Sequence, residues 1–189
     1  MKVPFIDLKA QYRVIKDEVE NSLQEVMANT AFASGPFVQR FEEEFVEFCG
    51  AKYCVAVNSG TSALHVALLA HGIQPGDEVI TVSNTFIATT WAISYCGANP
   101  VFVDIDSETC LINHDLIEQA ITNKTKAIMP VHLTGRVCEM DPIIALAEKY
   151  SLAVIEDAAQ AIGSKYKDHL SGSFGHVGCF STHPLKNLN

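Results

Sequence analysis

The chain has little positive charge: 13 Lys and Arg stand against 22 Asp and Glu, which gives a formal charge of −9. Nucleic acids and anionic membranes are bound by clusters of Lys and Arg, and the sequence contains no such cluster. We therefore expect neither of them as a partner. A small anionic ligand is not excluded, because a single site can be cationic in an acidic protein.

The sequence also lacks the spacings of a metal site or a disulfide framework. Its six cysteines are scattered without a C-x-x-C pair, and none of its seven histidines forms a metal-binding pair. The N-terminus has no apolar signal-peptide core, and the most apolar stretch, SALHVALLAHGI, is short and interrupted by two histidines. We expect buried thiols, no metal and a reducing, cytoplasmic environment.

Two helices are expected in the first 50 residues. From Asp7 to Met27 apolar residues recur at three- and four-residue steps, which predicts a helix. A second helix is predicted between the turn at residues 34–36 and Gly50, with glutamates on its solvent-exposed face. Its apolar stripe is interpreted as core, without a chemical role, and consists of Phe37, Phe41, Phe45 and Phe48.

After residue 50 the chain alternates short β-rich runs with helical segments. The expected strands are 53–57, 78–82, 100–105, 126–131, 152–157 and 177–181. Strands that are apolar throughout and alternate with helices predict an α/β fold, a mostly parallel sheet with helices on both faces. Ligands of such sheets lie beyond the carboxyl ends of the strands, so residues that follow strands are the candidate site residues.

Small residues follow the first expected strand and lead directly into a helix. Gly60, Thr61 and Ser62 stand at this helix start, where free backbone N–H groups and two hydroxyls suit a phosphate ester. The same residue types also form an ordinary helix N-cap, and both interpretations stay open.

The fifth expected strand ends in two acids, Glu156 and Asp157. A carboxylate there is partly desolvated, which is acceptable only if it finds a cation or strong hydrogen-bond donors. A protonated pyridine nitrogen would be such a partner, and Gln160 lies about one helical turn further on. The alternative is an acid that caps a helix.

Other candidates lie near strand ends as well. Phe86 stands where it could stack on a flat ring, although most phenylalanines there belong to the core. Ser181 ends the last expected strand and Lys186 follows five residues later, where a lysine taken alone is usually a solvated charge. His132 and His183 are more often polar lining than ligands. The glycine-rich run 172–178 precedes a strand, so we interpret it as a turn and not as a dinucleotide fingerprint.

Together these stretches resemble the DegT-type family of sugar-nucleotide aminotransferases, which are fold-type-I pyridoxal-phosphate enzymes. The matching strings cover almost the whole chain and include VNSGTSALHVAL, TFIATTWAI, GANPVFVDID, IEDAAQAIGS and CFSTHPLKN. The resemblance implies that Lys186 carries pyridoxal 5′-phosphate, that Asp157 pairs with the pyridine nitrogen, and that Gln160 lies near the phenolic oxygen.

The resemblance further implies a phosphate site at Gly60, Thr61, Ser62 and Ser181, with Phe86 stacked on the ring. It implies ping-pong transfer of an amino group from an amino-acid donor, glutamate in this family, to a nucleotide-linked keto sugar, and a homodimer. Residues 1–36 would form an N-terminal arm and helix, and residues 37–189 an incomplete large domain. Relatives run to roughly twice this length, so the small domain would be absent and we expect the 189-residue chain alone to be inactive and unstable.

Three rival interpretations remain. A dehydratase branch of the same family uses this cofactor but has histidine in place of the lysine, so Lys186 speaks against it. A non-catalytic or partial fragment would keep the motifs without the assembled site. A dinucleotide-binding module lacks its glycine fingerprint here. Thr134 and Arg136 stand where many relatives have Tyr and Gln, which leaves the substrate open.

Overall fold

The structure is a computed structural model that describes Val3 and residues 6–188, so part of the expected N-terminal arm lies outside the described residues. Its helices are α1 (Leu8–Ala28), α2 (Pro36–Cys49), α3 (Gly60–Ala70), α4 (Ala88–Tyr95), α5 (Ile117–Ala120) and α6 (Met140–Tyr150), with 3-10 turns η1 (His114–Leu116) and η2 (Leu133–Gly135). Its strands are β1 (Glu78–Val82), β2 (Asn99–Val103), β3 (Thr125–Ile128), β4 (Ala153–Asp157), β5 (Lys165–Tyr166), β6 (His169–Leu170) and β7 (Val177–Cys179).

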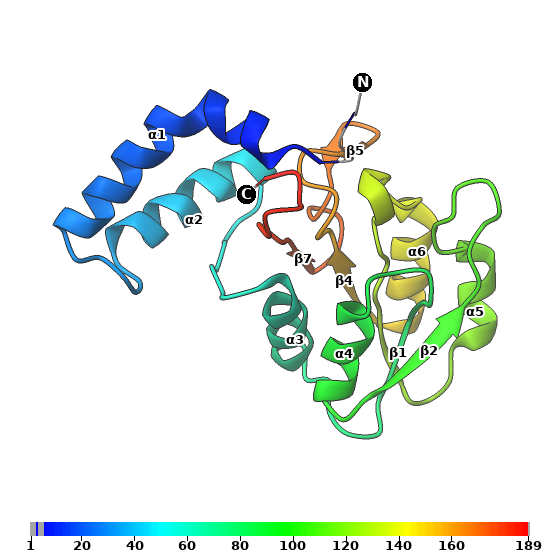
Figure 1. The fold of residues 1–189 in the computed structure, drawn as a ribbon. Coiled ribbons are helices and arrows are strands. Elements are labelled where there is room, and N and C mark those ends of the chain that lie inside the picture. Colours follow the sequence, from blue (N-terminus) through cyan, green and yellow to red (C-terminus); the bar gives the residue numbers. More distant parts are fainter. Residues whose placement is uncertain (1–2, 4–5, 189) are drawn as a thin grey trace.

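A five-stranded sheet forms the centre of the molecule, with the order β2-β1-β3-β4-β7 and parallel pairing throughout (Figure 1). Alternate strand residues point to opposite faces. Val79 and Ile155 join the cluster with α3 and α4, whereas Ile80 and Val154 join the cluster with α5 and α6. The predicted α/β fold with a parallel sheet between two helical layers is therefore confirmed.

The first expected strand, residues 53–57, is wrong as a strand. The segment is extended chain without sheet pairing, and Tyr53 and Val55 are 78% and 76% exposed. One of its N–H groups, that of Ala56, donates to the Glu42 side chain at 2.7 Å instead of to a neighbouring strand. β-rich composition is not sufficient, because a strand needs a partner, and the described residues supply none here.

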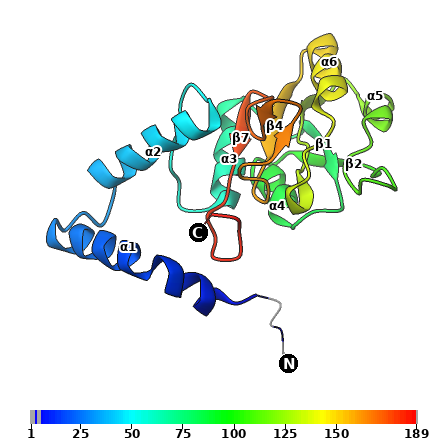
Figure 2. The ribbon, with the colours of Figure 1, turned by 90° about the horizontal axis from the view of Figure 1, so that it is seen from above.

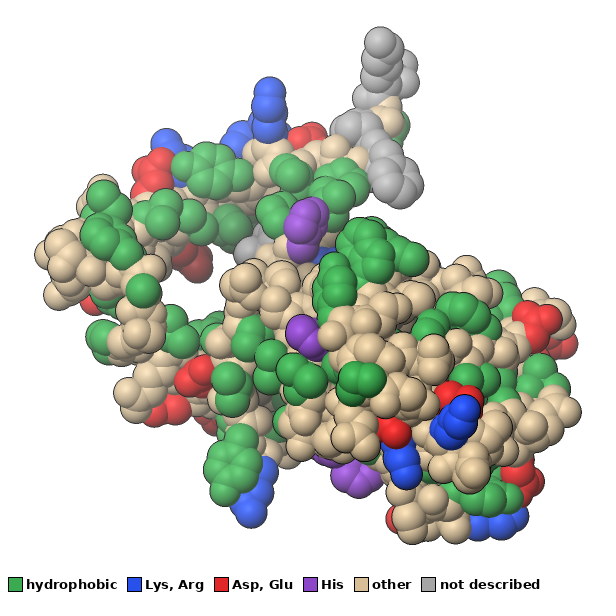
Figure 3. All heavy atoms as spheres, turned by 90° about the horizontal axis from the view of Figure 1, so that it is seen from below, with side chains coloured by type: hydrophobic (Ala, Val, Ile, Leu, Met, Phe, Trp, Pro, Cys, Tyr) green, Lys and Arg blue, Asp and Glu red, His purple; other side chains and the backbone are tan. Residues whose placement is uncertain are grey.

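Both N-terminal helices are confirmed to within about a residue. α1 is capped by Asp7, whose side chain accepts from the Ala10 N–H at 2.9 Å, and α2 ends at Gly50 in the left-handed conformation. The two helices extend beside the sheet and do not cover it (Figure 2), and open space separates part of them from the body (Figure 3).

The interpretation of the phenylalanine stripe as core is wrong. Phe41 is 38% and Phe48 is 49% exposed, and α1 contains no buried residue. Phe45 does contact the sheet region, since its ring meets that of Phe180 edge-on at 5.1 Å. An amphipathic pattern predicts which face of a helix is apolar, but it does not say what covers that face.

The cysteines follow the expectation of buried thiols in most cases. Cys49, Cys96, Cys138 and Cys179 are buried, Cys54 is half-buried and Cys110 is exposed. Among the described residues, no helix combines the length and apolarity that crossing a membrane requires.

Candidate active site

The carboxyl end of β4 carries the two acids that the sequence singled out. Both side chains are buried, Glu156 at 0% and Asp157 at 6% exposure. Because neighbouring strand residues point to opposite faces, Asp157 turns toward α4 and Glu156 toward the other helical layer. The two carboxyl groups therefore have separate sets of partners.

Asp157 accepts few hydrogen bonds for a buried acid. The Thr89 hydroxyl on α4 donates to one oxygen at 2.6 Å, and the Ala159 N–H donates to the other at 3.2 Å. A carboxylate has about four acceptor positions, so roughly half of its capacity is unused. Burial raises the pKa of Asp157, while these two hydrogen bonds and the nearby His132 and Lys186 act in the opposite direction.

Lys186 lies on a turn that follows β7. Its backbone N–H donates to the His183 carbonyl at 2.7 Å, and the His183 N–H approaches the Ser181 hydroxyl at 3.4 Å. The half-buried Lys186 is close enough to Asp157 to act on its pKa. The expected lysine and the expected acid thus lie near each other.

The start of α3 meets the residues that follow β7. A Cβ atom at Gly60 would lie 2.9 Å from the Ser181 Cβ, so only glycine permits this approach. Ser59 caps the helix: its hydroxyl oxygen accepts from the Ser62 N–H at 3.1 Å. The N–H groups of Gly60 and Thr61 belong to the first turn, which has no partners within a helix. The N-cap and anion-site interpretations are compatible, since the cap leaves these two donors available.

The remaining expected residues frame the same region. Phe86 is 60% exposed, and its carbonyl accepts from the Thr89 N–H at 3.2 Å, so the residue that contacts Asp157 also holds the Phe86 backbone. Gln160 is half-buried, and its side-chain oxygen accepts from the Thr134 N–H at 2.8 Å. Thr134 adopts a left-handed conformation in η2 and orients Gln160 through its backbone N–H.

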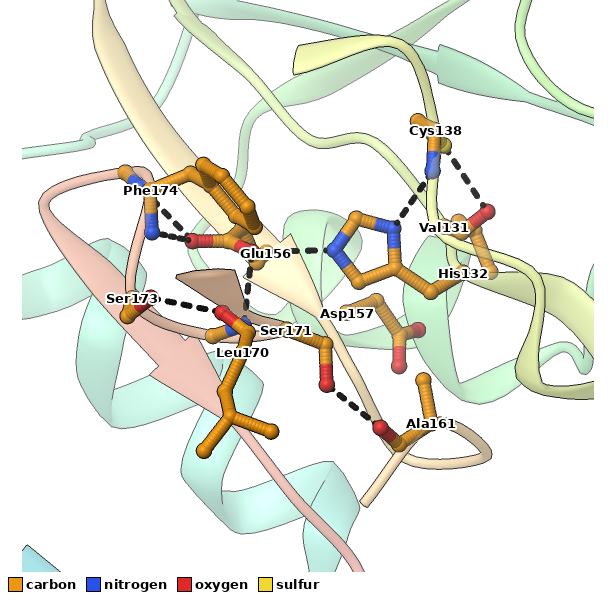
Figure 4. A network of polar contacts seen from close by, with 12 residues as sticks. Val131, His132, Cys138, Glu156, Asp157, Ala161, Leu170, Ser171, Ser173 and Phe174 are labelled. Atoms are coloured by element: carbon orange, nitrogen blue, oxygen red, sulfur yellow. Dashed lines mark hydrogen bonds and ion pairs between the residues drawn. The ribbon is translucent and has the colours of Figure 1, made fainter. Parts of the chain in front are cut away.

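Glu156 is surrounded by donors, as Figure 4 shows. One oxygen accepts from His132 Nε2 at 2.9 Å and from the Gly172 N–H at 2.7 Å, and the other accepts from the Phe174 and Gly175 N–H groups at 2.8 and 2.6 Å. The glycine-rich run does form turns, as predicted, but it also wraps this acid.

Sequence reasoning missed Thr89, the contact of His132 and the second role of the glycine-rich run. Thr89 is fully buried on α4, and a hydroxyl at such a position needs a buried partner. Within the described part of the chain, no group of three or more His, Cys, Asp or Glu is placed to hold a metal ion.

Comparison with known proteins decides the family. Residues 13–189 match the model of the DegT/DnrJ/EryC1/StrS aminotransferase family. The chain belongs to this family. It is 46% identical over 188 residues to a pleiotropic regulatory protein of Geobacillus stearothermophilus, covering 100% of this chain and 50% of that protein. It is 44% identical to the UDP-2-acetamido-2-deoxy-3-oxo-D-glucuronate aminotransferase of Pseudomonas aeruginosa, covering 98% of this chain and 52% of the relative.

Solved structures of the family agree over the same region. DesV of S. venezuelae, in complex with a ketimine intermediate, has a TM-score of 0.97 and 41% identity, with 100% of this chain and 51% of that chain covered. NtdA of Bacillus subtilis with bound cofactor PMP has a TM-score of 0.91 and 42% identity, with 100% and 42% covered. DegT-family aminotransferases use pyridoxal 5′-phosphate. The chain spans about half the length of the relatives it matches.

Proposed function

We propose that the protein containing this chain transfers an amino group from an amino-acid donor, glutamate as in the family, to a nucleotide-linked keto sugar, with pyridoxal 5′-phosphate bound at this site. The observation that carries the proposal is the state of Asp157: a buried carboxyl group with unused acceptor capacity and a raised pKa, facing the region of Lys186. Such a group is stabilised by a cation, and a protonated pyridine nitrogen supplies one.

The other residues fit the cofactor as well. A phosphate group is accepted at a helix N-terminus, and the start of α3 with Gly60, Thr61 and Ser62 meets Ser181. Phe86 has the exposure that a residue stacking on the ring requires before the ligand binds. The Gln160 amide, fixed by Thr134, is assigned to the phenolic oxygen.

The bound cofactor supplies an electron-withdrawing ring that stabilises the carbanion formed when a proton leaves the donor. Asp157 holds a proton on the pyridine nitrogen through an ionic hydrogen bond, and Thr89 fixes the direction of its carboxylate. Lys186 Nζ, when unprotonated, would hold the cofactor covalently. Once the amino donor has displaced it, the free Lys186 amine would accept the proton from the α-carbon of the donor and return it. Amino transfer in two half-reactions then follows ping-pong kinetics.

The assembly and location are part of the same proposal. We infer a homodimer in the cytoplasm, with residues 1–36 as an arm and residues 37–189 as the cofactor-binding domain. The helical arm extends from the body and exposes an apolar face, as expected of a segment that contacts a second subunit. The dehydratase alternative stays disfavoured because its branch has histidine at the position of Lys186.

The test is to load the complete protein with pyridoxal 5′-phosphate, reduce it with borohydride and map the labelled peptide. We expect the reduced cofactor on Lys186, and a label on Lys165 or Lys167 of the β5–β6 hairpin would overturn the assignment. Lys186→Arg should abolish labelling, whereas the matched control Lys165→Arg, on an exposed strand, should not. Incubation with glutamate and a nucleotide-linked keto sugar then tests whether the amino group is transferred.

A further inference from the structure

We propose that Glu156 is a positioning residue that holds the segment bearing Ser181 and Lys186 in register with Asp157. The inference rests on the proposed function, because it concerns how the cofactor-binding groups are placed relative to one another. Glu156 does not face the candidate site: its carboxyl group lies on the opposite face of β4 and is fully buried.

The hydrogen-bond pattern shows that Glu156 is ionised. Its partners are three backbone N–H groups and one ring nitrogen of His132, and a protonated carboxyl would need an acceptor that this set lacks. The other ring nitrogen of His132 accepts from the Cys138 N–H at 3.2 Å. The ring proton is therefore on Nε2, where it is donated to Glu156, and the imidazole is neutral.

Backbone dipoles thus stabilise this buried charge in place of a counter-ion. The successive N–H groups of Phe174 and Gly175 converge on this anion together with that of Gly172, and such a nest forms only in one backbone conformation. The conformation is demanding here: Gly172 has φ +81°, and a Cβ at Gly178 would lie 2.4 Å from the Gly172 Cα. The charge of Glu156 therefore selects one arrangement of the loop that leads into β7.

This arrangement reaches the candidate site along the chain. β7 begins two residues after Gly175 and pairs with β4 so that Glu156 lies opposite Gly178 and Asp157 opposite Cys179. Ser181 and Lys186 follow. On the other side, His132 belongs to the corner before η2, where the Thr134 N–H holds Gln160. Glu156 accordingly connects three segments: β4 with Asp157, the segment of Ser181 and Lys186, and the corner that holds Gln160.

Glu156→Gln tests the nest directly. The amide replaces one acceptor oxygen by an NH2 group, which then faces two N–H donors. In the complete, cofactor-free protein we expect hydrogen exchange of the Gly172, Phe174 and Gly175 amides to become faster. In the loaded protein we expect cofactor binding to be about tenfold weaker, which is the factor that one hydrogen bond to a charged group contributes. We also expect the pH titration of the cofactor absorbance to shift. Glu148→Gln, an exposed acid on α6, is the matched control and should change neither.

A second pair of variants keeps the test decisive if Glu156→Gln does not fold. His132→Gln retains a donor near the Nε2 position, whereas His132→Asn retains only a group near Nδ1. We expect His132→Asn to weaken cofactor binding about tenfold and His132→Gln to restore it to within about twofold. Equal behaviour of the two variants would overturn the role of the His132–Glu156 contact.

The outcomes separate this inference from the proposed function. Faster amide exchange with unchanged cofactor affinity and an unchanged absorbance titration would show that Glu156 is only structural, and would overturn the inference while the proposed function stands. If the unmodified protein bound no cofactor, both would fail. Weaker binding together with a shifted titration in Glu156→Gln, and not in Glu148→Gln, supports the inference.

Discussion

Two adjacent acids at the end of β4, Glu156 and Asp157, are buried to nearly the same degree and held in opposite ways. Glu156 accepts four hydrogen bonds and has no unused acceptor position. Asp157 accepts two, and its pKa is raised by burial. Burial alone therefore does not distinguish a structural acid from a functional one. What distinguishes them is whether the protein itself supplies enough donors, because an acid that lacks them is stabilised by a ligand that brings positive charge.

Neutralising Asp157 should produce the largest effect. We expect Asp157→Asn to preserve the fold and to raise the barrier to amino transfer by on the order of 2–4 kcal/mol, since a neutral amide no longer keeps the ring nitrogen protonated. This corresponds to a rate about 30 to 1000 times lower, measured as the half-reaction of the loaded protein with an amino donor. Asp115→Asn, at an exposed acid in η1, is the control. Near-normal rates in Asp157→Asn would mean that this acid only caps the following turn.

The sequence anticipated the fold where the signal is local. Apolar strands such as 152–157 and helices with a three- to four-residue period were placed correctly, because each pattern reflects the burial of its own segment. Segment 53–57 has the same composition but lies unpaired, since pairing depends on residues elsewhere in the chain. The phenylalanine stripe of α2 fails for the same reason: its pattern cannot say what packs on it.

The residues of the candidate site were likewise only in part predictable from the sequence. The residues that follow strands, among them Asp157 and Ser181, were recognisable because the topology brings such positions to one edge of the sheet. The donors to Glu156 were not, because the nest at residues 172–175 lies 16 to 19 positions away and His132 lies 24 positions away. The sequence did show that a buried acid needs donors, but not which residues provide them.

Thr89 makes the contrast between the two acids sharper. Its hydroxyl provides one of the two hydrogen bonds to Asp157, and Thr85 supports it through a contact of 2.8 Å between the two hydroxyl oxygens. We expect Thr89→Val to lower the rate of amino transfer roughly tenfold, which corresponds to about 1.5 kcal/mol for a hydrogen bond to a charged group. Thr89→Ser should recover most of this loss because it keeps the hydroxyl.

The control for Thr89 is its neighbour on α4. Thr90→Val makes the same chemical change at a position without a hydrogen bond to Asp157 and should leave the rate within about twofold. A loss in Thr90→Val as large as that in Thr89→Val would attribute the effect to repacking of α4. Equal losses in Thr89→Val and Thr89→Ser would also remove the hydroxyl from the explanation.

The stability of the cofactor-free protein, which involves no catalysis, is where the two acids should respond with opposite signs. The folded-state pKa of Asp157 lies above its ordinary value of 3.8 because burial disfavours the charged form. The stability that this group contributes is therefore present below the unfolded pKa and is lost as the pH rises through the folded pKa.

Asp157→Asn removes the titrating group, so the variant should unfold at a higher temperature than the unmodified protein at pH 7, with the difference shrinking toward pH 4. Glu156→Gln should instead unfold at a lower temperature, because it leaves buried N–H groups without an acceptor. Its free energy of unfolding should fall by about 1–3 kcal/mol. Thermal unfolding of both variants between pH 4 and 8 gives the comparison, and bound pyridoxal 5′-phosphate should reverse the order for Asp157→Asn by preferring the unmodified acid. A cofactor-free Asp157→Asn that is less stable than the unmodified protein at pH 7 would show that Asp157, like Glu156, is already satisfied by its own chain.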